Sequence, residues 1–189
     1  MAWGRHAWCR PCWTRGPVVS TDRLRPLRAE DLPLVRAWRN HPAVRQHMFT
    51  THEITADEHA QWFQRQQADA TRRLYLFERD GVPQGFMHLS GVRPGGVCEW
   101  GFYAAPDAPR GTGRAMGAAT LAELFEVEQV HKICGQVLQG NRASLRFHEA
   151  LGFQPEGVLP QPHVGADGQR QDVHCYGLQA EAWRATRTG

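Results

Sequence analysis

Along this chain the apolar positions change their period several times, and each change predicts a new secondary-structure element. Leu32, Leu34, Val35 and Trp38 follow a helical period, which predicts an amphipathic helix. Short apolar runs bounded by glycine, proline or aspartate predict strands instead. Helices are expected over residues 29–40, 55–68, 116–128, 143–151 and 180–187, and strands over 20–27, 74–78, 84–92, 97–103, 131–138, 153–159 and 169–178.

Capping and turn residues indicate where several of these elements begin and end. Thr55, followed three residues later by Glu58, has the pattern of a capping box that starts a helix, whereas Pro42 stops the preceding helix. Asp80-Gly81 and Asp167-Gly168 predict tight hairpin turns. The order β-α-α-β-β-β-α-β-α-β-β places hairpins before a β-α-β-α-β unit. We therefore expect an α/β fold with one mixed sheet of about seven strands and helices on both faces.

Size and composition narrow the class of protein. The chain has 189 residues, 41% apolar and 22% charged, which is typical of one globular domain. Its net charge is +3 and its only lysine is Lys132, so it lacks the concentrated basic face of a nucleic-acid-binding protein. No apolar run approaches the ~18 residues that a membrane span needs. We expect a cytoplasmic protein with neither nucleic-acid nor membrane partners.

The domain is expected to cover residues 22–180. Residues 1–21 contain Arg5, Arg10 and Arg15 but no acidic residue. They resemble a transit peptide only weakly, because serine is nearly absent, and a disordered or non-native N-terminal extension is the preferred interpretation. Residues 181–189 are expected to form a short C-terminal tail.

The five cysteines are odd in number and scattered. Cys98, Cys134 and Cys175 lie in predicted strands and are interpreted as reduced core residues. Cys9 and Cys12 form a Cys-x-x-Cys motif, but no strand precedes it and no helix follows it, as a redox site requires. The motif also supplies only two of the four ligands that zinc takes. No metal site is predicted.

The most informative segment is Arg110-Gly111-Thr112-Gly113-Arg114-Ala115, a glycine-rich turn that leads directly into a predicted helix. Such a turn gathers free backbone N–H groups at the positive end of the helix dipole, which makes a site for a pyrophosphate. The glycines let the backbone approach phosphate oxygens closely, and the two arginines add positive charge.

Two other phosphate-binding patterns fit this segment poorly. A dinucleotide-binding turn needs Gly-x-Gly-x-x-Gly, but Met116 stands at the third glycine position, and Leu138-Gln139 offers no acid after the next strand. A nucleoside-triphosphate loop needs Gly-Lys followed by Ser or Thr, which is absent.

A second block, from Asn141 to Phe153, follows the next predicted strand. Together the two blocks resemble the acetyl-CoA site of the GNAT acetyltransferases. The resemblance implies the GNAT fold, in which one strand splays away from its neighbour and pantetheine pairs with the free strand edge. It implies that acetyl-CoA contacts Phe102, Tyr103, Ala104, Arg110, Gly111, Thr112, Gly113, Arg114, Ala115, Asn141, Ser144 and Phe147.

Asn141 is open to a second interpretation, as the N-cap of the following helix. His148 stands where many GNAT enzymes have a tyrosine that protonates the departing CoA thiolate. A free histidine has a pKa of about 6.5, so about a quarter is protonated at pH 7, and nearby phosphates would raise that fraction. The expected catalytic residues are His148 as the acid and Glu99 as acceptor of the amine proton, with His88 as the other candidate acceptor. His148 is alternatively a residue that packs beside pantetheine or makes a structural hydrogen bond.

Trp38-Arg39-Asn40 and the segment Val44 to Phe49, with the two blocks, resemble the nucleotide-sugar N-acetyltransferases of pseudaminic acid biosynthesis. The implied reaction is transfer of acetyl to the 4-amino group of a UDP-linked 4-amino-4,6-dideoxy sugar. Trp38 is open to a core interpretation, and His163 is a further, weaker substrate candidate. The substrate-binding residues expected on this basis are Arg39, Asn40, Met48, Phe49, His52 and His88.

Two other functions stay open at the level of the sequence. One is an acetyltransferase of protein N-termini, as in ribosomal-protein acetylation, which would need a peptide groove. The other is an acyl-CoA-binding module without turnover. The sequence also leaves open whether the protein is a homodimer.

Overall fold

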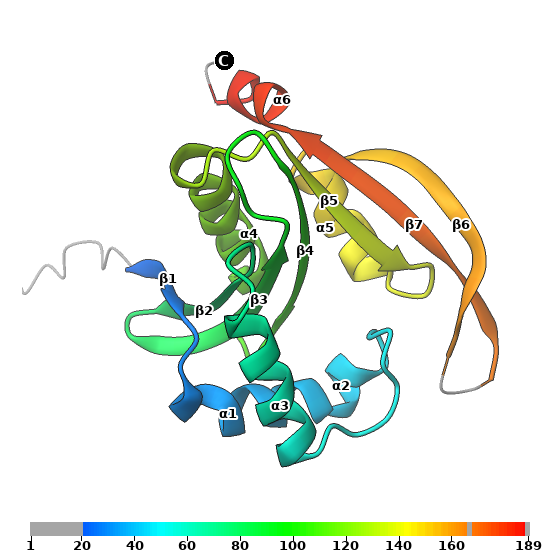
Figure 1. Ribbon diagram of the computed structural model, residues 1–189. Helices are drawn as coiled ribbons and strands as arrows, with labels where there is room; N and C mark the ends of the chain where they lie inside the picture. Colours follow the sequence, from blue (N-terminus) through cyan, green and yellow to red (C-terminus); the bar gives the residue numbers. More distant parts are fainter. Residues whose placement is uncertain (1–20, 166–167, 188–189) are drawn as a thin grey trace, which may run out of the picture.

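A mixed sheet of seven strands, in the order β1-β2-β3-β4-β5-β7-β6, organises the chain (Figure 1). The computed structural model describes residues 21–165 and 168–187. Residues 1–20 of the expected N-terminal extension, with their Cys-x-x-Cys motif, and Asp167 therefore lie outside the described residues. The strands are β1 (Asp22–Pro26), β2 (Arg73–Arg79), β3 (Val82–Ser90), β4 (Val97–Ala104), β5 (Lys132–Leu138), β6 (Gln154–Val164) and β7 (Arg170–Gln179).

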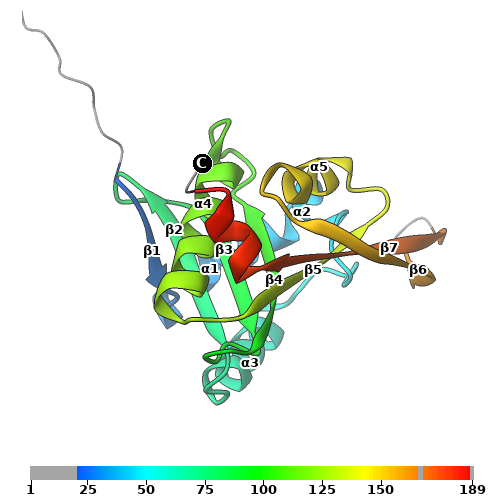
Figure 2. The ribbon, with the colours of Figure 1, turned by 90° about the horizontal axis from the view of Figure 1, so that it is seen from above.

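Helices cover both faces of the sheet, as predicted (Figure 2). Strand residues alternate between two cores: Tyr75 and Phe77 of β2 face the core that α4 and α5 cover, and Leu76 faces the core beneath α1 and α3. The helices are α1 (Leu32–Asn40), α2 (Pro42–Arg45), α3 (Ala56–Gln67), α4 (Thr112–Ala122), α5 (Arg142–Ala150) and α6 (Ala180–Ala185).

Most predicted boundaries are confirmed within a few residues, and local hydrogen bonds explain the exceptions. The capping box at α3 is present: the Thr55 side chain accepts from the Glu58 amide, and the Glu58 carboxylate accepts from the Thr55 amide. The helix expected over 29–40 begins instead as a 3₁₀ turn, η1 (Ala29–Asp31). The short helix α2 was not predicted, because its start is capped by the His41 ring, which accepts from the Ala43 amide.

Two further elements differ in length from the prediction. The helix expected over 116–128 is α4 followed by a π-helical turn, η2 (Glu123–Val127). Strand β6 runs to Val164 rather than 159, with a register shift between Leu159 and His163.

The expected splayed strands are β4 and β5. Their parallel pairing covers only three positions, from Val97 opposite Lys132 to Glu99 opposite Cys134, after which the strands part. On its other side β4 stays paired with β3 through Ala104. One edge of β4 therefore has free backbone groups from Trp100 onwards, which is the geometry that adding an extended ligand requires.

The C-terminal segment is held to the body by α6. Trp183 is buried and its ring lies 5.2 Å from that of Phe125. Within the described residues, no helix combines the length and the apolar character needed to cross a membrane.

Candidate functional site

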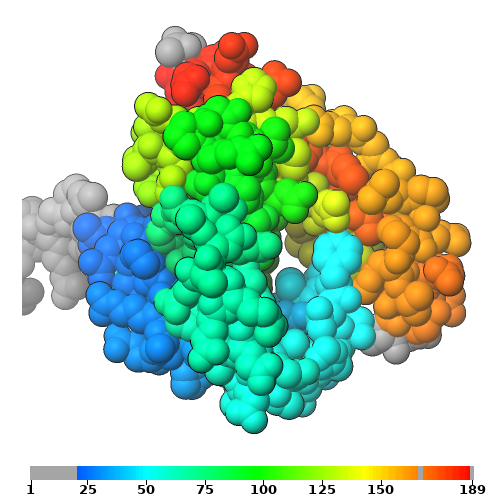
Figure 3. Space-filling model, in the orientation of Figure 1, coloured from blue at the N-terminus to red at the C-terminus, as the bar shows by residue number. Residues whose placement is uncertain are grey.

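Three neighbouring cavities lie where β4 and β5 part. The central cavity, of about 370 Å³, is lined by Glu99, His88 and His148 among others. The α3 cavity, of about 430 Å³, lies against α3, and the α5 cavity, of about 360 Å³, lies against α5. Met48 and Phe102 line all three, so the cavities adjoin one another. Figure 3 shows the molecule hollowed beside the cyan segment that follows α2.

That segment, residues 46–55, is fastened to α1 by side chains. Asn40 donates from Nδ2 to the Ile54 carbonyl and accepts from the Ile54 amide, both at 2.8 Å. Arg39 donates from Nη2 to the Thr50 carbonyl at 2.8 Å. The side-chain amide of Asn40, an expected substrate residue, is therefore hydrogen-bonded to the loop. The bonds from Asn40 and Arg39 anchor the segment that contains Met48, which lines the cavities.

The glycine-rich turn has the geometry expected of an anion site. Gly111 is the N-cap of α4 with φ of +89°, a conformation that glycine adopts without strain. Within the described residues, the amides of Gly113 and Arg114 have no acceptor, and Arg110 and Arg114 have no acidic partner. Thr112 differs from its neighbours, because it is buried and its hydroxyl donates to Gln84 at 3.1 Å.

The N-terminal end of α5 forms the wall of the α5 cavity. Asn141 lines this cavity, and its Oδ1 accepts from the Ser144 amide at 3.0 Å, so the N-cap interpretation is confirmed. Ser144 and Phe147 line it too. A Cβ at Gly117 would come within 2.8 Å of the Phe147 ring, so that glycine lets α4 and α5 pack closely.

The far half of β4 forms the opposite wall. Phe102, Tyr103 and Ala104 all line the α5 cavity and lie beyond the last pair with β5. The structure thus brings together the expected backbone contacts and the expected α5 contacts of acetyl-CoA around one cavity.

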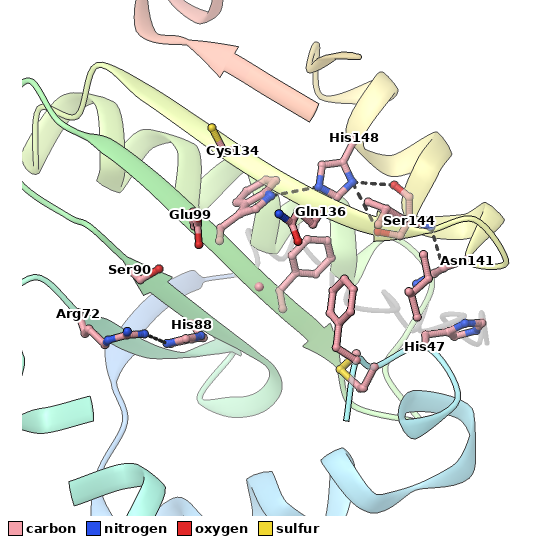
Figure 4. Close-up of a pocket in the computed structure, with 17 residues that line it drawn as sticks. His47, Arg72, His88, Ser90, Glu99, Cys134, Gln136, Asn141, Ser144 and His148 are labelled. Carbon is pink, nitrogen blue, oxygen red and sulfur yellow. Dashed lines mark hydrogen bonds between the residues drawn. The ribbon is translucent and has the colours of Figure 1, made fainter. Parts of the chain in front are cut away.

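His148 is buried and both of its ring nitrogens are used (Figure 4). Nδ1 lies 2.8 Å from the Ser144 carbonyl, and Nε2 lies 3.1 Å from the indole nitrogen of Trp100. Burial lowers the pKa of His148 below the ordinary 6.5, although the bond to Ser144 opposes this. The surroundings therefore favour the neutral ring, opposite to the expected increase in its protonation.

Glu99 and His88 line the central cavity, as a proton acceptor requires, but their surroundings differ. Arg72 Nη1 lies 3.1 Å from His88 Nε2, and the side-chain oxygen of Gln66 lies 3.0 Å from the same nitrogen. Burial, and then the charge of Arg72, lower the pKa of His88. Glu99 is exposed, and within the described residues its carboxylate has no hydrogen-bond or ion-pair partner.

Two residues that line the α3 cavity, Arg39 and His59, each have a buried side-chain nitrogen that lacks a partner within the described residues: Arg39 Nη1 and His59 Nδ1. The His59 ring stacks on Trp62 with centroids 5.1 Å apart. Burial lowers the pKa of both Arg39 and His59. An unpaired buried donor is costly, so these two nitrogens are exceptions to the usual pairing of buried polar groups.

The other predicted substrate residues are divided between the cavities and the loop surface. His52 lines the α3 cavity and pairs with Glu58 at 3.3 Å. Phe49 lines the central cavity, is half exposed, and its ring centroid lies 5.5 Å from that of His163. Trp38 is buried in the core beneath α1, as its alternative interpretation stated.

Sequence reasoning missed several lining residues, of which His59, Arg72 and Trp100 matter most here. His59 and Trp62 lie on α3 next to Phe63, where a helical apolar face reads simply as core. No local signal could have identified them, because their cavity exists only once α3 packs on the sheet.

The described cysteines are all free. Cys98 is buried as expected, whereas Cys134 and Cys175 are only half-buried, and Cys134 lines the central cavity. The described residues contain no cluster of His, Cys, Asp or Glu suited to a metal ion.

The fold and this site define a class of protein. Residues 23–154 match the acetyltransferase (GNAT) domain, and the chain belongs to that family. It is an acetyl-CoA-dependent N-acetyltransferase. The parted strands and the free amides at the start of α4 fit the extended pantetheine and the diphosphate of that cofactor.

Particular relatives narrow the comparison further. The chain is 27% identical to acetyltransferase PseH of Campylobacter jejuni, over 72% of this chain and 85% of that protein. It is 32% identical to an N-acetyltransferase of Streptomyces griseus, over 90% of this chain and 96% of that protein.

A solved structure confirms the fold. The spermidine N-acetyltransferase of Vibrio cholerae, in complex with CoA and spermine, superposes with a TM-score of 0.79 at 22% identity, covering 86% of this chain and 98% of that one. At this identity the likeness speaks for the fold alone.

Proposed function

We propose that this N-acetyltransferase acetylates the 4-amino group of a UDP-linked 4-amino-4,6-dideoxy sugar. The resemblance to the nucleotide-sugar enzymes and the relatives named PseH support this acceptor. The observation that carries the proposal is the α3 cavity, with the partnerless Arg39 Nη1 and the stacked His59 and Trp62.

The chemistry of that cavity suits a nucleotide better than a polyamine. A guanidinium donates to phosphate or carbonyl oxygens and repels a polycation. Stacked flat rings offer a surface for a planar base. In this proposal Arg39, His52 and His59 meet the nucleotide, while the sugar extends past Met48 and His88 into the central cavity.

The reaction is direct attack of the neutral amine on the thioester carbonyl carbon. A C–N bond forms, the C–S bond breaks, and CoA departs as a thiolate, while the amine proton passes to the protein directly or through water. We assign Glu99 as the proton acceptor, because its carboxylate faces the central cavity unpaired, whereas His88 Nε2 is already in contact with Arg72 and Gln66.

The cofactor is proposed to use the opposite side of the site. The amides of Gly113 and Arg114, with Arg110 and Arg114, hold the diphosphate. Pantetheine runs along the free edge of β4 between Phe102 and Ala104 and the wall that Asn141, Ser144 and Phe147 form. Its thioester then reaches the central cavity where the two strands part.

Mass spectrometry tests the acceptor directly. The protein is incubated with acetyl-CoA and the UDP-4-amino sugar, and we expect a product with one added acetyl group. The same sugar with a 4-hydroxyl is the control acceptor and should stay unmodified. Transfer to an N-terminal peptide or to spermidine but not to the sugar would refute the proposed acceptor, and binding of acetyl-CoA without any transfer would favour a non-catalytic module.

The proton acceptor is tested by Glu99→Gln. Since positioned acid–base groups contribute about 10²-fold or more, we expect kcat to fall on the order of 100-fold. The affinity for acetyl-CoA should be unchanged, because Glu99 lies outside the α5 cavity. If Glu99→Gln has a normal kcat, Glu99 is not the proton acceptor, and His88 becomes the candidate for that role.

A further inference from the structure

The strands part at a defined pair of residues. Pairing of β4 with β5 ends at Glu99 and Cys134, so Trp100 and Gly135 stand at the first position where the ladder is lost. Beyond this position the two strands have different neighbours. β4 continues along the α5 cavity, whereas β5 stays paired with β7 through Leu138. Whatever fixes the geometry at Trp100 and Gly135 therefore fixes where β4 lies relative to α5.

In the part of the chain that the structure describes, one side-chain hydrogen bond joins β4 to α5 across this gap. The indole nitrogen of Trp100 lies 3.1 Å from His148 Nε2, and both side chains are buried. An indole N–H can only donate, so Nε2 must accept and carries no proton. Nδ1 then carries the proton and donates to the Ser144 carbonyl at 2.8 Å, which fixes the tautomer.

The glycine on β5 is what lets this bond form. A Cβ at Gly135 would lie 2.5 Å from His148 Nε2 and 2.8 Å from Trp100 Nε1. The backbone of β5 therefore passes directly against the hydrogen bond, with no side chain between them. Any larger residue at this position would push the two rings apart.

The surrounding rings leave the pair little freedom. Trp100 stacks on Phe153 with centroids 4.8 Å apart, and His148 stacks on Tyr176 at 5.2 Å. Phe102 packs against Trp100 at 5.3 Å. Phe102 also lines the α5 cavity. A shift of Trp100 and His148 would therefore move Phe102 and, with it, the wall of that cavity.

We propose that Trp100 and His148 form a brace that sets the spacing of β4 and α5, and so the width of the acetyl-CoA channel. His148 is then a positioning residue that acts through Trp100, and not the acid that protonates the leaving thiolate. The proposal rests on the use of acetyl-CoA by the family and is independent of the sugar acceptor.

A double-mutant cycle on cofactor binding tests the brace. Trp100→Phe keeps a ring but removes the N–H, and His148→Phe keeps a ring but removes the acceptor. Acetyl-CoA affinity is measured by calorimetry on the full chain with no amine present, so the result does not depend on which acceptor is correct. We expect each single variant to weaken binding about tenfold and the double variant to weaken it no further, since the two act as one unit.

Two measurements distinguish a positioning role of His148 from a role as catalytic acid: the acetyl-CoA affinity of a conservative variant and its kcat. His148→Gln retains a side-chain oxygen that can accept from the indole, so it should bind acetyl-CoA nearly as tightly as the unmodified protein. With saturating acetyl-CoA its kcat should stay within a few-fold of normal. His131→Phe, the same exchange at an exposed histidine, is the matched control and should change neither quantity.

Several outcomes would overturn the proposal. Additive effects of the two phenylalanine variants would mean that the side chains act independently. Unchanged affinity in Trp100→Phe would remove the brace. A large loss of kcat in both His148 variants at normal affinity would restore the role of acid. If His148→Phe fails to fold, Gly135→Ala supplies an independent test, because its Cβ displaces the same hydrogen bond, and normal acetyl-CoA affinity in that variant would also refute the brace.

Discussion

The α5 cavity and the α3 cavity share Met48, Phe102 and Tyr103, yet they are built in different ways. The α5 cavity is lined mainly by small and apolar residues from two short stretches, 102–106 and 141–147. The α3 cavity gathers Arg39, His52, His59 and His88 from α1, the 46–55 loop, α3 and β3.

This difference teaches how the two ligands are recognised. A cofactor common to a whole family can be held by backbone groups, which any sequence supplies once a turn and a free strand edge exist. An acceptor specific to one enzyme needs side chains of chosen chemistry. In the proposed assignment the α3 cavity supplies those side chains, and the partnerless nitrogens of Arg39 and His59 carry a cost of burial there.

The largest expected effect tests the cofactor side. In Gly113→Val the new side chain would cover the free amides at the start of α4 and weaken acetyl-CoA binding on the order of 100-fold, about 2.7 kcal/mol. A Cβ at this position lies 3.9 Å from Phe147, which is ordinary contact, so the fold should survive. Calorimetry with acetyl-CoA measures the affinity.

The control for that variant is Ala118→Val, which adds the same side chain at an exposed position of α4. It should bind acetyl-CoA normally. If Gly113→Val also binds normally, the diphosphate does not use this turn, and the contrast between backbone and side-chain recognition fails.

A smaller effect is expected on the acceptor side. Arg39→Met removes a charged donor that has no protein partner at Nη1 and should raise KM for the acceptor by about 10-fold to 100-fold, since bonds to charged groups contribute about 1.5–3 kcal/mol. KM for acetyl-CoA should stay unchanged. Steady-state kinetics with each substrate varied in turn would show the split.

Arg36→Met provides the matched control for Arg39. Arg36 lies on the same helix and donates to the Ile54 carbonyl at 3.4 Å, but it does not line the α3 cavity. Its substitution should leave both KM values near normal. Equal effects of the two substitutions would mean that Arg39 acts only by holding the 46–55 loop.

The smallest effect concerns pH, and both sides contribute to it. Burial lowers the pKa of His59 and His88 beside the α3 cavity and of His148 beneath β5. The native rings stay neutral just below pH 6.5, whereas the unfolded chain binds protons there, so acidification favours unfolding. The free energy of unfolding should decrease as pH falls from about 6.5 toward the lowered native pKa values, by up to about 1.4 kcal/mol per pH unit for each histidine.

Urea denaturation between pH 7.5 and 5 measures this dependence. His59→Phe and His148→Gln should each make the slope shallower by one proton or less. A slope identical to that of the unmodified protein in both variants would show that other groups, and not the buried rings, govern acid stability.

The local sequence accounts for the elements of the site and for much of its cofactor side. The apolar periods predicted the succession of helices and strands along the chain, the Thr55–Glu58 capping box predicted the start of α3, and the glycine turn predicted the free amides of α4. These features depend on residues within a few positions of one another, so they can be predicted from the sequence without knowledge of the tertiary structure. The short helix α2 escaped prediction because its cap is an uncommon one, a histidine ring.

Only the tertiary structure decided what the other residues do. Asn40 was expected to bind substrate but makes two hydrogen bonds to Ile54, and His59, to which the sequence assigned no role, lines a cavity and has a ring nitrogen without a partner. His148 had the position of an acid, yet its neighbours are an indole donor and a carbonyl contributed by β4 and α5. The protonation, burial and hydrogen bonding of these side chains depend on groups that are distant in the chain. Those groups come together only when the sheet and its helices have packed.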